Sequence, residues 1–209
     1  MIFRIIDNKL YEIETTLSDK EFLRINSISG FQYISKLKTE LPTVSNFKYE
    51  IFYMLDSNNN IIIDINRTLE NAKKERYKKL ENIFKLKWLQ IQMVAIDKPY
   101  MGDPETIQAQ IDSYQKLYEG ALQILKDEPE NKEALAIKAK YEEALALTTK
   151  VNLVMQKVRG LLEDKIEAVT DVNDTKVDEL LTFANELQLS KENLTDEKLA
   201  EVLTIFEGQ

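Results

Sequence analysis

The residues of this sequence that could do acid–base chemistry are carboxylates, which are abundant and in places adjacent. Glu142 and Glu143 form one adjacent pair, and Glu163 and Asp164 form another. Acid–base catalysis needs two carboxyl groups that face one substrate from fixed positions. Both pairs fall in a stretch with helical periodicity, where consecutive side chains do not face each other. We therefore expect no catalytic residues among them.

Histidine and cysteine, which carry much of enzymatic and metal chemistry, are absent. The Ser-His-Asp and Cys-His mechanisms are excluded, as are zinc sites with Cys ligands. The sequence contains no phosphate-binding loop, dinucleotide fingerprint or nucleophile elbow. A calcium site built on Asp56 lacks the spacing of several acidic ligands. The sequence predicts a chain that is not an enzyme and has no catalytic, cofactor-binding or metal site.

A basic stretch over residues 73–87 contains Tyr77 and is followed by Trp88, a pattern that can serve phosphates and bases. Acidic residues are interleaved with it at helical spacings, namely Glu70, Glu75 and Glu81. Because the chain is acidic overall, we favour a solvated helix face over a nucleic-acid site or another anion-binding role.

The net charge of -8 is distributed in blocks along the chain. Residues 67–99 carry nine basic side chains against four acidic ones, whereas residues 100–209 carry 23 acidic against 12 basic. Opposite charges of this kind predict attraction between the basic helical segment and the acidic C-terminal half, within the molecule or across an oligomer.

Residues 1–66 have the pattern of a small α+β domain with two β-hairpins. Two short apolar runs flank the turn at residues 7–9 and predict the first hairpin. Alternation over 47–55, a turn at 56–60 and an apolar return over 61–65 predict the second.

Two short helices are expected between these hairpins. Ser18 and Glu21 have the spacing of a capping box, which predicts a helix start. The second short helix is expected over residues 31–37, after Gly30 and before Pro42.

At Thr68 the apolar period changes from two to 3.6, so residues 67–209 are expected to form a helical domain. Asp103 and Pro104 predict the start of a helix that Pro129 ends. The uninterrupted apolar seam over about 131–169 predicts one long helix, and a C-terminal helix pair follows over about 175–189 and 196–206. The predicted fold is mainly α, with long antiparallel helices as a helical hairpin or coiled coil in the C-terminal two-thirds.

The long helix and the last helix supply the candidate protein-interaction residues. A helix of this length needs a partner along its seam, either other helices of this chain or a second copy. We expect a hairpin with residues 104–125 before about Thr148, and packing against the C-terminal helices or another subunit after it. The candidates are Val151, Met155, Val158, Leu162, Leu199, Val202, Leu203 and Phe206.

Two further features bear on where the chain works. No run approaches the roughly 18 to 20 apolar residues of a membrane span, and the start of the sequence lacks a secretion signal. We therefore expect a protein of the cytoplasm that contacts no membrane.

The junction around Pro129 resembles the junction between two tetratricopeptide repeats. It consists of residues 118–122, 125–131 and 133–135, and it does not recur after 34 residues. This resemblance implies a helical adaptor that binds a partner peptide in a groove between helices.

A second resemblance lies in the arrangement of a β-rich start that runs into Leu69-Glu70-Asn71-Ala72-Lys73 and a helical half. It is similar to bacteriophage tail-fibre assembly proteins and related small tail accessory proteins. The resemblance implies a non-catalytic structural or chaperone-like protein that binds a tail-fibre or baseplate component, in the host cytoplasm or the virion.

The sequence thus leaves two main hypotheses. The first is a self-associating assembly or structural protein of a phage tail or tail fibre that acts by helix packing. The alternative is a cytoplasmic helical adaptor that binds a partner peptide.

Overall fold

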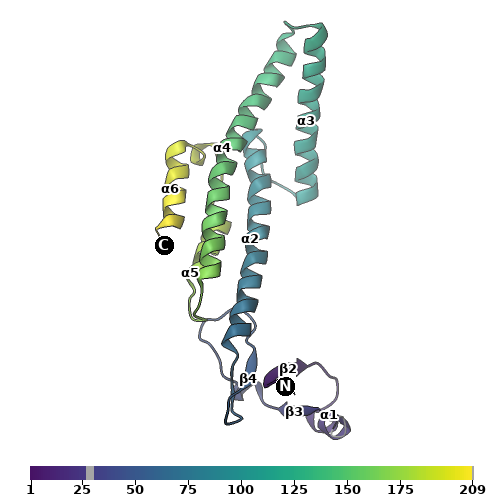
Figure 1. Ribbon diagram of the computed structural model, residues 1–209. Coiled ribbons are helices and arrows are strands. Elements are labelled where there is room, and N and C mark those ends of the chain that lie inside the picture. Colours follow the sequence, from purple (N-terminus) through teal and green to yellow (C-terminus); the bar gives the residue numbers. More distant parts are fainter. Residues whose placement is uncertain (27–30, 209) are drawn as a thin grey trace. The chain divides into compact units, whose positions relative to one another are not determined.

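The computed structural model describes residues 1–26 and 31–208, which form six α-helices and a five-stranded antiparallel sheet (Figure 1). This confirms the predicted class, a mainly α chain with a small N-terminal α+β part. None of the helices in the described ranges combines the length and apolar character needed to cross a membrane.

The chain divides into two compact units. The N-terminal unit holds residues 1–75 and 168–175, and the helical unit holds residues 76–167 and 176–209. The boundary between the units falls inside helix α2 (Ile65–Ala95), between residues 75 and 76. The change of apolar period predicts a boundary earlier, after residue 66. Each unit has its own hydrophobic core.

The N-terminal unit is built on a sheet with the strand order β3-β1-β2-β4-β5. Its strands are β1 (Ile2–Ile6), β2 (Lys9–Ile13), β3 (Gln32–Ser35), β4 (Tyr53–Leu55) and β5 (Ile61–Ile63). Asp7 and Asn8 both adopt positive φ in the β1–β2 turn, as expected for a tight hairpin. The core of the unit contains Phe3, Leu10, Leu41 and Leu55. Along the chain, α1 (Asp19–Asn26) connects β2 to β3, and the 3-10 turn η1 (Lys38–Glu40) lies between β3 and β4.

Two local predictions for this unit are wrong. Within residues 31–37, Gln32–Ser35 form strand β3 instead of a helix, because Phe3 of β1 pairs with Ile34 on one side and with Glu12 on the other. Residues 47–55 form a strand only at Tyr53–Leu55, because Phe52 donates its N–H to Thr68 Oγ1 (3.0 Å) and accepts from Asp64 N (2.8 Å).

The predicted helices of the C-terminal part are confirmed with small changes of boundary. They are α3 (Pro104–Asp127), α4 (Lys132–Ala168), α5 (Lys176–Glu186) and α6 (Asp196–Glu207), with η2 (Lys191–Asn193) before α6. Asp103 caps α3 by accepting from Thr106 N (2.8 Å), and Asn131 caps α4 by accepting from Ala134 N (3.1 Å). Helix α2 begins before Thr68, because Asp64 is the residue that caps it, with Arg67 N at 3.1 Å from its carboxylate.

Helix α4 takes part in two hydrophobic clusters, in agreement with the predicted split near Thr148. Ala144 packs with Ile107 of α3 and Met93 of α2. Val151 and Met155 pack further along with residues of the C-terminal segment, which are Leu189, Leu194 and Leu199. In Figure 1 the α3–α4 hairpin extends past the C-terminal end of α2. The long helix therefore finds its partners inside the chain.

Opposite charges join the basic helix to the acidic C-terminal part within one molecule. Arg76, buried on α2, lies 2.7 Å from the Asp178 carboxylate on α5. Lys87, also buried, donates to the Leu187 carbonyl at 2.5 Å, just beyond the end of α5. Burial lowers the pKa of the Lys87 ammonium. Each of these two cations is thus bound by a group of the C-terminal part of the same chain.

Candidate partner-binding groove

The candidate interaction residues from the sequence lie mostly in the interior of the helical unit. Val151, Met155, Val158 and Leu162 are buried along one side of α4, and Leu199 and Phe206 are buried on α6. Val202 and Leu203 are partly buried. The chain's own helices already cover most of this surface, so a binding site for another molecule has to be sought among exposed residues. The role of these eight residues toward a partner stays a prediction.

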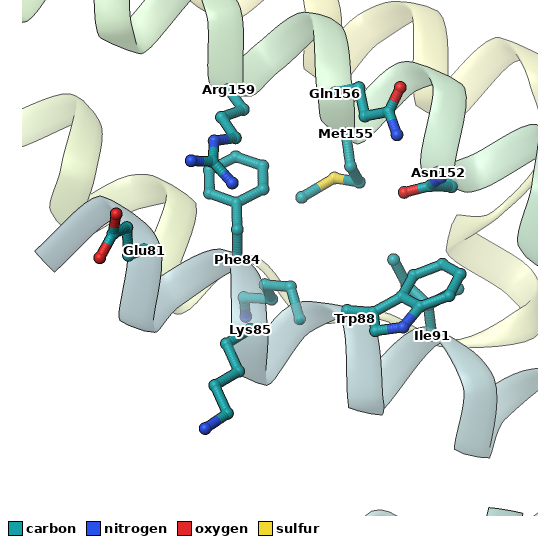
Figure 2. Close-up of a pocket in the computed structure, with 10 residues that line it drawn as sticks. Glu81, Phe84, Lys85, Trp88, Ile91, Asn152, Met155, Gln156 and Arg159 are labelled. Carbon is teal, nitrogen blue, oxygen red and sulfur yellow. The ribbon is translucent and has the colours of Figure 1, made fainter. Parts of the chain in front are cut away.

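A first hollow of about 370 Å³ lies between α2 and α4. Figure 2 shows Phe84 and Trp88 of α2 and Met155 and Asn152 of α4 around this space, while Lys85 points away from it. Ile91 and Met155 are buried and form apolar parts of its lining. The hollow combines apolar walls with a polar rim, the usual composition of a binding site.

A second hollow of about 210 Å³ adjoins the first, between the C-terminal part of α2, α3 and α4. The two hollows share Trp88 and Asn152 as lining residues. The two hollows lie in succession along α4, with lining residues from Tyr141 to Arg159, and we name the surface that they make up the Trp88 groove. Residues 141–159 of a helix span about 27 Å, enough for roughly eight residues of an extended peptide.

Small side chains on α4 leave room for the second hollow. Ala144 and Thr148 line it, where a larger residue would fill the space between the helices. The hydroxyl groups of Thr148 and Thr149 both donate to the Leu145 carbonyl, at 2.9 and 2.8 Å. Because these hydroxyls are bonded inside their own helix, they present chiefly methyl groups to the groove.

Trp88, the only tryptophan of the chain, lies at the junction of the two hollows and is 39% exposed. Leu145, on the opposite wall, is 54% exposed. Large apolar side chains exposed beside a concave surface are typical of protein interaction sites, and tryptophan is enriched among the residues that dominate binding energy. Trp88 is therefore the strongest candidate for a contact residue.

Three side-chain amides line the two hollows together with Trp88. Gln92 follows it by one turn of α2, and Asn152 and Gln156 are one turn apart on α4. Among the described residues these three amides form no hydrogen bond to another group of the chain, in contrast to Gln115, which donates to Glu119 at 3.0 Å. A side-chain amide has both donor and acceptor atoms, so it can pair with the N–H and C=O of a peptide backbone.

One wall of the second hollow is held by stacked tyrosines. The Tyr141 ring of α4 lies 4.1 Å from the Tyr118 ring and 5.8 Å from the Tyr114 ring of α3, with interplanar angles of 9° and 23°. Stacked aromatic contacts of this kind add to the energy of burial and fix side-chain positions. The α3–α4 side of the groove is therefore preorganised.

The charges at the rim are few. Lys85 and Glu81 are exposed on α2, and Arg159 pairs with Glu163 one turn along α4, at 2.8 Å. Tyr77, one aromatic residue of the nucleic-acid interpretation, donates to Glu167 at 2.8 Å. The other, Trp88, lies in the groove.

No group of three or more acidic residues in the described ranges is placed to hold a metal ion. The groove itself holds amides and aromatic rings, which bind by contact and hydrogen bonding.

The sequence did not point to this groove. Its periodicity assigned Trp88 to the apolar face of α2, where burial is the ordinary outcome. A signal was nevertheless present, since Gln92 follows Trp88 at the spacing of one helical turn and places an amide beside the ring. The small residues opposite lie more than fifty positions away, so only the fold brings them together. Comparison of the chain with protein-family models, curated proteins and solved structures found no match.

Proposed function

We propose that this chain is a non-catalytic binding protein whose helical unit holds a segment of a partner protein in the Trp88 groove. The observation that carries the proposal is the position of Trp88, which is exposed and lines both hollows. Three side-chain amides line them with it and form no intramolecular hydrogen bond among the described residues. This corresponds to the adaptor hypothesis from the sequence.

The partner segment that fits is an extended peptide with at least one large apolar side chain. Its apolar residue packs on Trp88 and Leu145, and its backbone pairs with Asn152 and Gln156. Burial of an aromatic contact of this kind, with water excluded around it, typically dominates an interface.

The arrangement of a small β-rich part before Leu69-Glu70-Asn71-Ala72-Lys73 suggests which class of protein the partner belongs to. On its resemblance to tail-fibre assembly proteins, we propose a fibre or baseplate component as that partner, and a chaperone or structural role in tail assembly. The work would be done in the host cytoplasm or in the virion.

A second candidate function is self-association. Apolar side chains are exposed on the α3–α4 hairpin, including Leu117, Ile124 and Leu135. A second copy that covered this surface would make the chain an oligomeric structural protein. Sedimentation equilibrium at micromolar concentration separates the candidates, because the first is compatible with a monomer and the second is not.

The test of the proposed function uses a random peptide library selected on the full-length chain. Peptides that bind are then titrated while the emission of Trp88 is followed, since no other tryptophan contributes. We expect the emission of the unmodified chain to change on binding. We also expect the affinity, measured for both proteins by fluorescence anisotropy of a labelled peptide, to fall at least about tenfold in Trp88→Ala.

The matched control is Leu153→Ala, which removes an exposed apolar side chain of α4 that does not line the groove. This variant should bind as the unmodified chain does. Selected peptides whose affinity is the same for Trp88→Ala and for the unmodified chain would contradict the proposal.

A further inference from the structure

The N-terminal unit contains a larger hollow, of about 770 Å³, at the point where strands β2 and β4 separate. The two strands pair only at Lys9–Met54 and Leu10–Tyr53. Beyond this pairing, β2 continues to Ile13, whereas β4 begins at Tyr53. The hollow lies between the rest of β2 and the segment 47–52, both of which line it.

This separation leaves one edge of β2 open. Backbone groups of alternate residues point to the same side of a strand. Because Asn8 O accepts from Leu55 N at 2.8 Å, the backbone groups of Leu10 and Glu12 also point toward the β4 side. Leu10 meets Tyr53 there, but Glu12 has no strand partner on that side among the described residues.

Aromatic and aliphatic side chains line the space next to the open edge. Glu12 shares a face of the sheet with its cross-strand partner Phe3, and Phe3 lies edge-to-face with Tyr53 at 6.0 Å. Arg67 lies 4.5 Å from the Tyr11 ring and 4.6 Å from the Phe52 ring. The hollow thus has apolar walls for the side chains of an added strand.

The charge of the lining favours a basic occupant. Glu12, Glu14 and Glu50 are exposed acids around the hollow, and they form no ion pair within the described residues. Two of the cationic groups that line it are engaged elsewhere. Arg67 lies 3.9 Å from Asp64 and donates to Leu10 O at 3.4 Å, and the Met1 ammonium lies 3.8 Å from Asp19 and donates to Lys36 O at 2.8 Å. Lys38 is the remaining cation of the lining, against three carboxylates.

From these observations we infer that the open edge of β2 at Glu12 is a second binding site, which accepts an extended peptide of alternating basic and apolar residues. The peptide adds a short strand to the sheet. Its backbone bonds the Glu12 N–H and C=O, its apolar side chains enter the hollow, and its cations meet Glu12, Glu14 and Glu50. Strand addition of this kind draws affinity from the backbone and specificity from alternate side chains.

The probe is a six-residue peptide of alternating lysine and valine, titrated into the full chain while hydrogen exchange at the Glu12 amide is measured. A glutamate-valine peptide of the same pattern tests the charge. Two lysine-valine peptides, each N-methylated at one alternate set of residues, test the backbone bonds. We expect slower exchange at Glu12 with the lysine-valine peptide only, and loss of binding for one of the N-methylated forms.

Two variants at one position separate charge from hydrogen bonding. Glu12→Gln removes the carboxylate and keeps the N–H, whereas Glu12→Pro removes both, and proline is tolerated where a strand N–H points away from the ladder. In calorimetric titrations, which need no amide at position 12, we expect Glu12→Pro to bind the lysine-valine peptide roughly fivefold more weakly than Glu12→Gln. If Glu12→Pro does not fold, the N-methylated peptides carry the same comparison on the unmodified chain.

Three results would overturn the inference. The first is equal binding of the glutamate-valine peptide, and the second is unchanged affinity of both N-methylated forms. The third is protection of Glu12 that depends on protein concentration without any peptide, because a second copy of the chain would then occupy the edge. The Trp88 groove is on a different unit, so none of these results bears on it.

Discussion

Arg76 and Asp178 form an ion pair of 2.7 Å in the interior of the helical unit, and they join helices separated by a hundred residues of sequence. The Arg76 side chain is 2% exposed and that of Asp178 is 11% exposed. Burial of a charge is costly unless an opposite charge compensates it, and the short Arg76–Asp178 contact lowers this cost for both residues. This pair, with the bond from Lys87 to Leu187, fixes α5 against α2.

Asp178→Asn should therefore destabilise the chain strongly, because it removes the carboxylate charge that lies 2.7 Å from the buried Arg76 guanidinium. We expect a loss of about 3 kcal/mol or more in the free energy of unfolding, measured by urea denaturation. The control is Lys198→Ala, which breaks the exposed Lys198–Glu201 pair and should cost less than about 1 kcal/mol. Equal stability of the two variants would show that the buried pair contributes little.

The two sides of α4 should respond differently to the same substitution. Leu162 is buried in the seam, whereas Leu153 is 59% exposed. Leu162→Ala removes packed methyl groups and leaves a cavity, so we expect a loss of about 2 to 5 kcal/mol. Leu153→Ala should change stability by less than about 0.5 kcal/mol. Both are read from urea melts, and comparable losses would contradict the assignment of the buried side.

Tyr77 should titrate at unusually high pH. Partial burial, followed by the hydrogen bond to Glu167 and the charges of Glu167, Glu163 and Asp164, raises the pKa of its phenol to about 12. In the difference between the ultraviolet titrations of the unmodified chain and Tyr77→Phe, we expect a midpoint near 12. A midpoint near the ordinary value of about 10 would show that the environment of Tyr77 is not as described.

The same shift has a consequence for stability with a definite sign. Because the pKa of Tyr77 is higher in the folded state than in the unfolded chain, the proton stabilises the fold. This contribution is fully present below pH 10, and it is lost as the pH rises from about 10 through about 12. The stability advantage of the unmodified chain over Tyr77→Phe should therefore shrink in this range, as measured by urea melts at each pH.

The start of α2 offers a test of its cap. The Asp64 carboxylate accepts from Arg67 N at 3.1 Å, so Asp64→Ala should cost about 0.5 to 2 kcal/mol. Asp64→Asn keeps an acceptor at the same position and should lose less. Thermal melts of the two variants give the comparison, and identical melting temperatures would argue against a capping role.

Local signals in the sequence predicted the helices well. Asp103, Asn131 and Thr195 cap helices in the structure as their residue types and positions indicate. A cap requires only a polar side chain and the next few backbone N–H groups, so the information lies within one turn. The length of α4 followed in the same way from an unbroken seam.

Strand positions depended on residues far away and were predicted less well. Residues 32–35 form a strand, although the sequence pattern predicts a helix over 31–37, because Ile34 pairs with Phe3, about thirty positions earlier. Phe52 has the alternation of a strand, but its backbone bonds Thr68 and Asp64. Pairing of this kind is decided by tertiary contacts that override local propensity.

The Trp88 groove could not be predicted from the sequence, for a related reason. Periodicity predicts which face of α2 is apolar, but whether Trp88 is covered depends on what lies opposite. Ala144 and Thr148 of α4 are too small to cover it, and their position beside Trp88 depends on the packing of three helices. The same applies to the open edge at Glu12, which exists because β4 is short.

Leu147 of α4 packs against both hydrophobic clusters of the helical unit, the one with α3 and the one with the C-terminal segment. Because both clusters pack against Leu147, we expect local unfolding of the α3–α4 hairpin to weaken the packing around Leu194 and Leu199 as well. A peptide seated in the Trp88 groove would contact α2, α3 and α4 at once and raise the cost of that opening. Binding of a peptide in the groove should therefore slow backbone amide exchange along the whole of α3, including the end of the helix that lies far from Trp88.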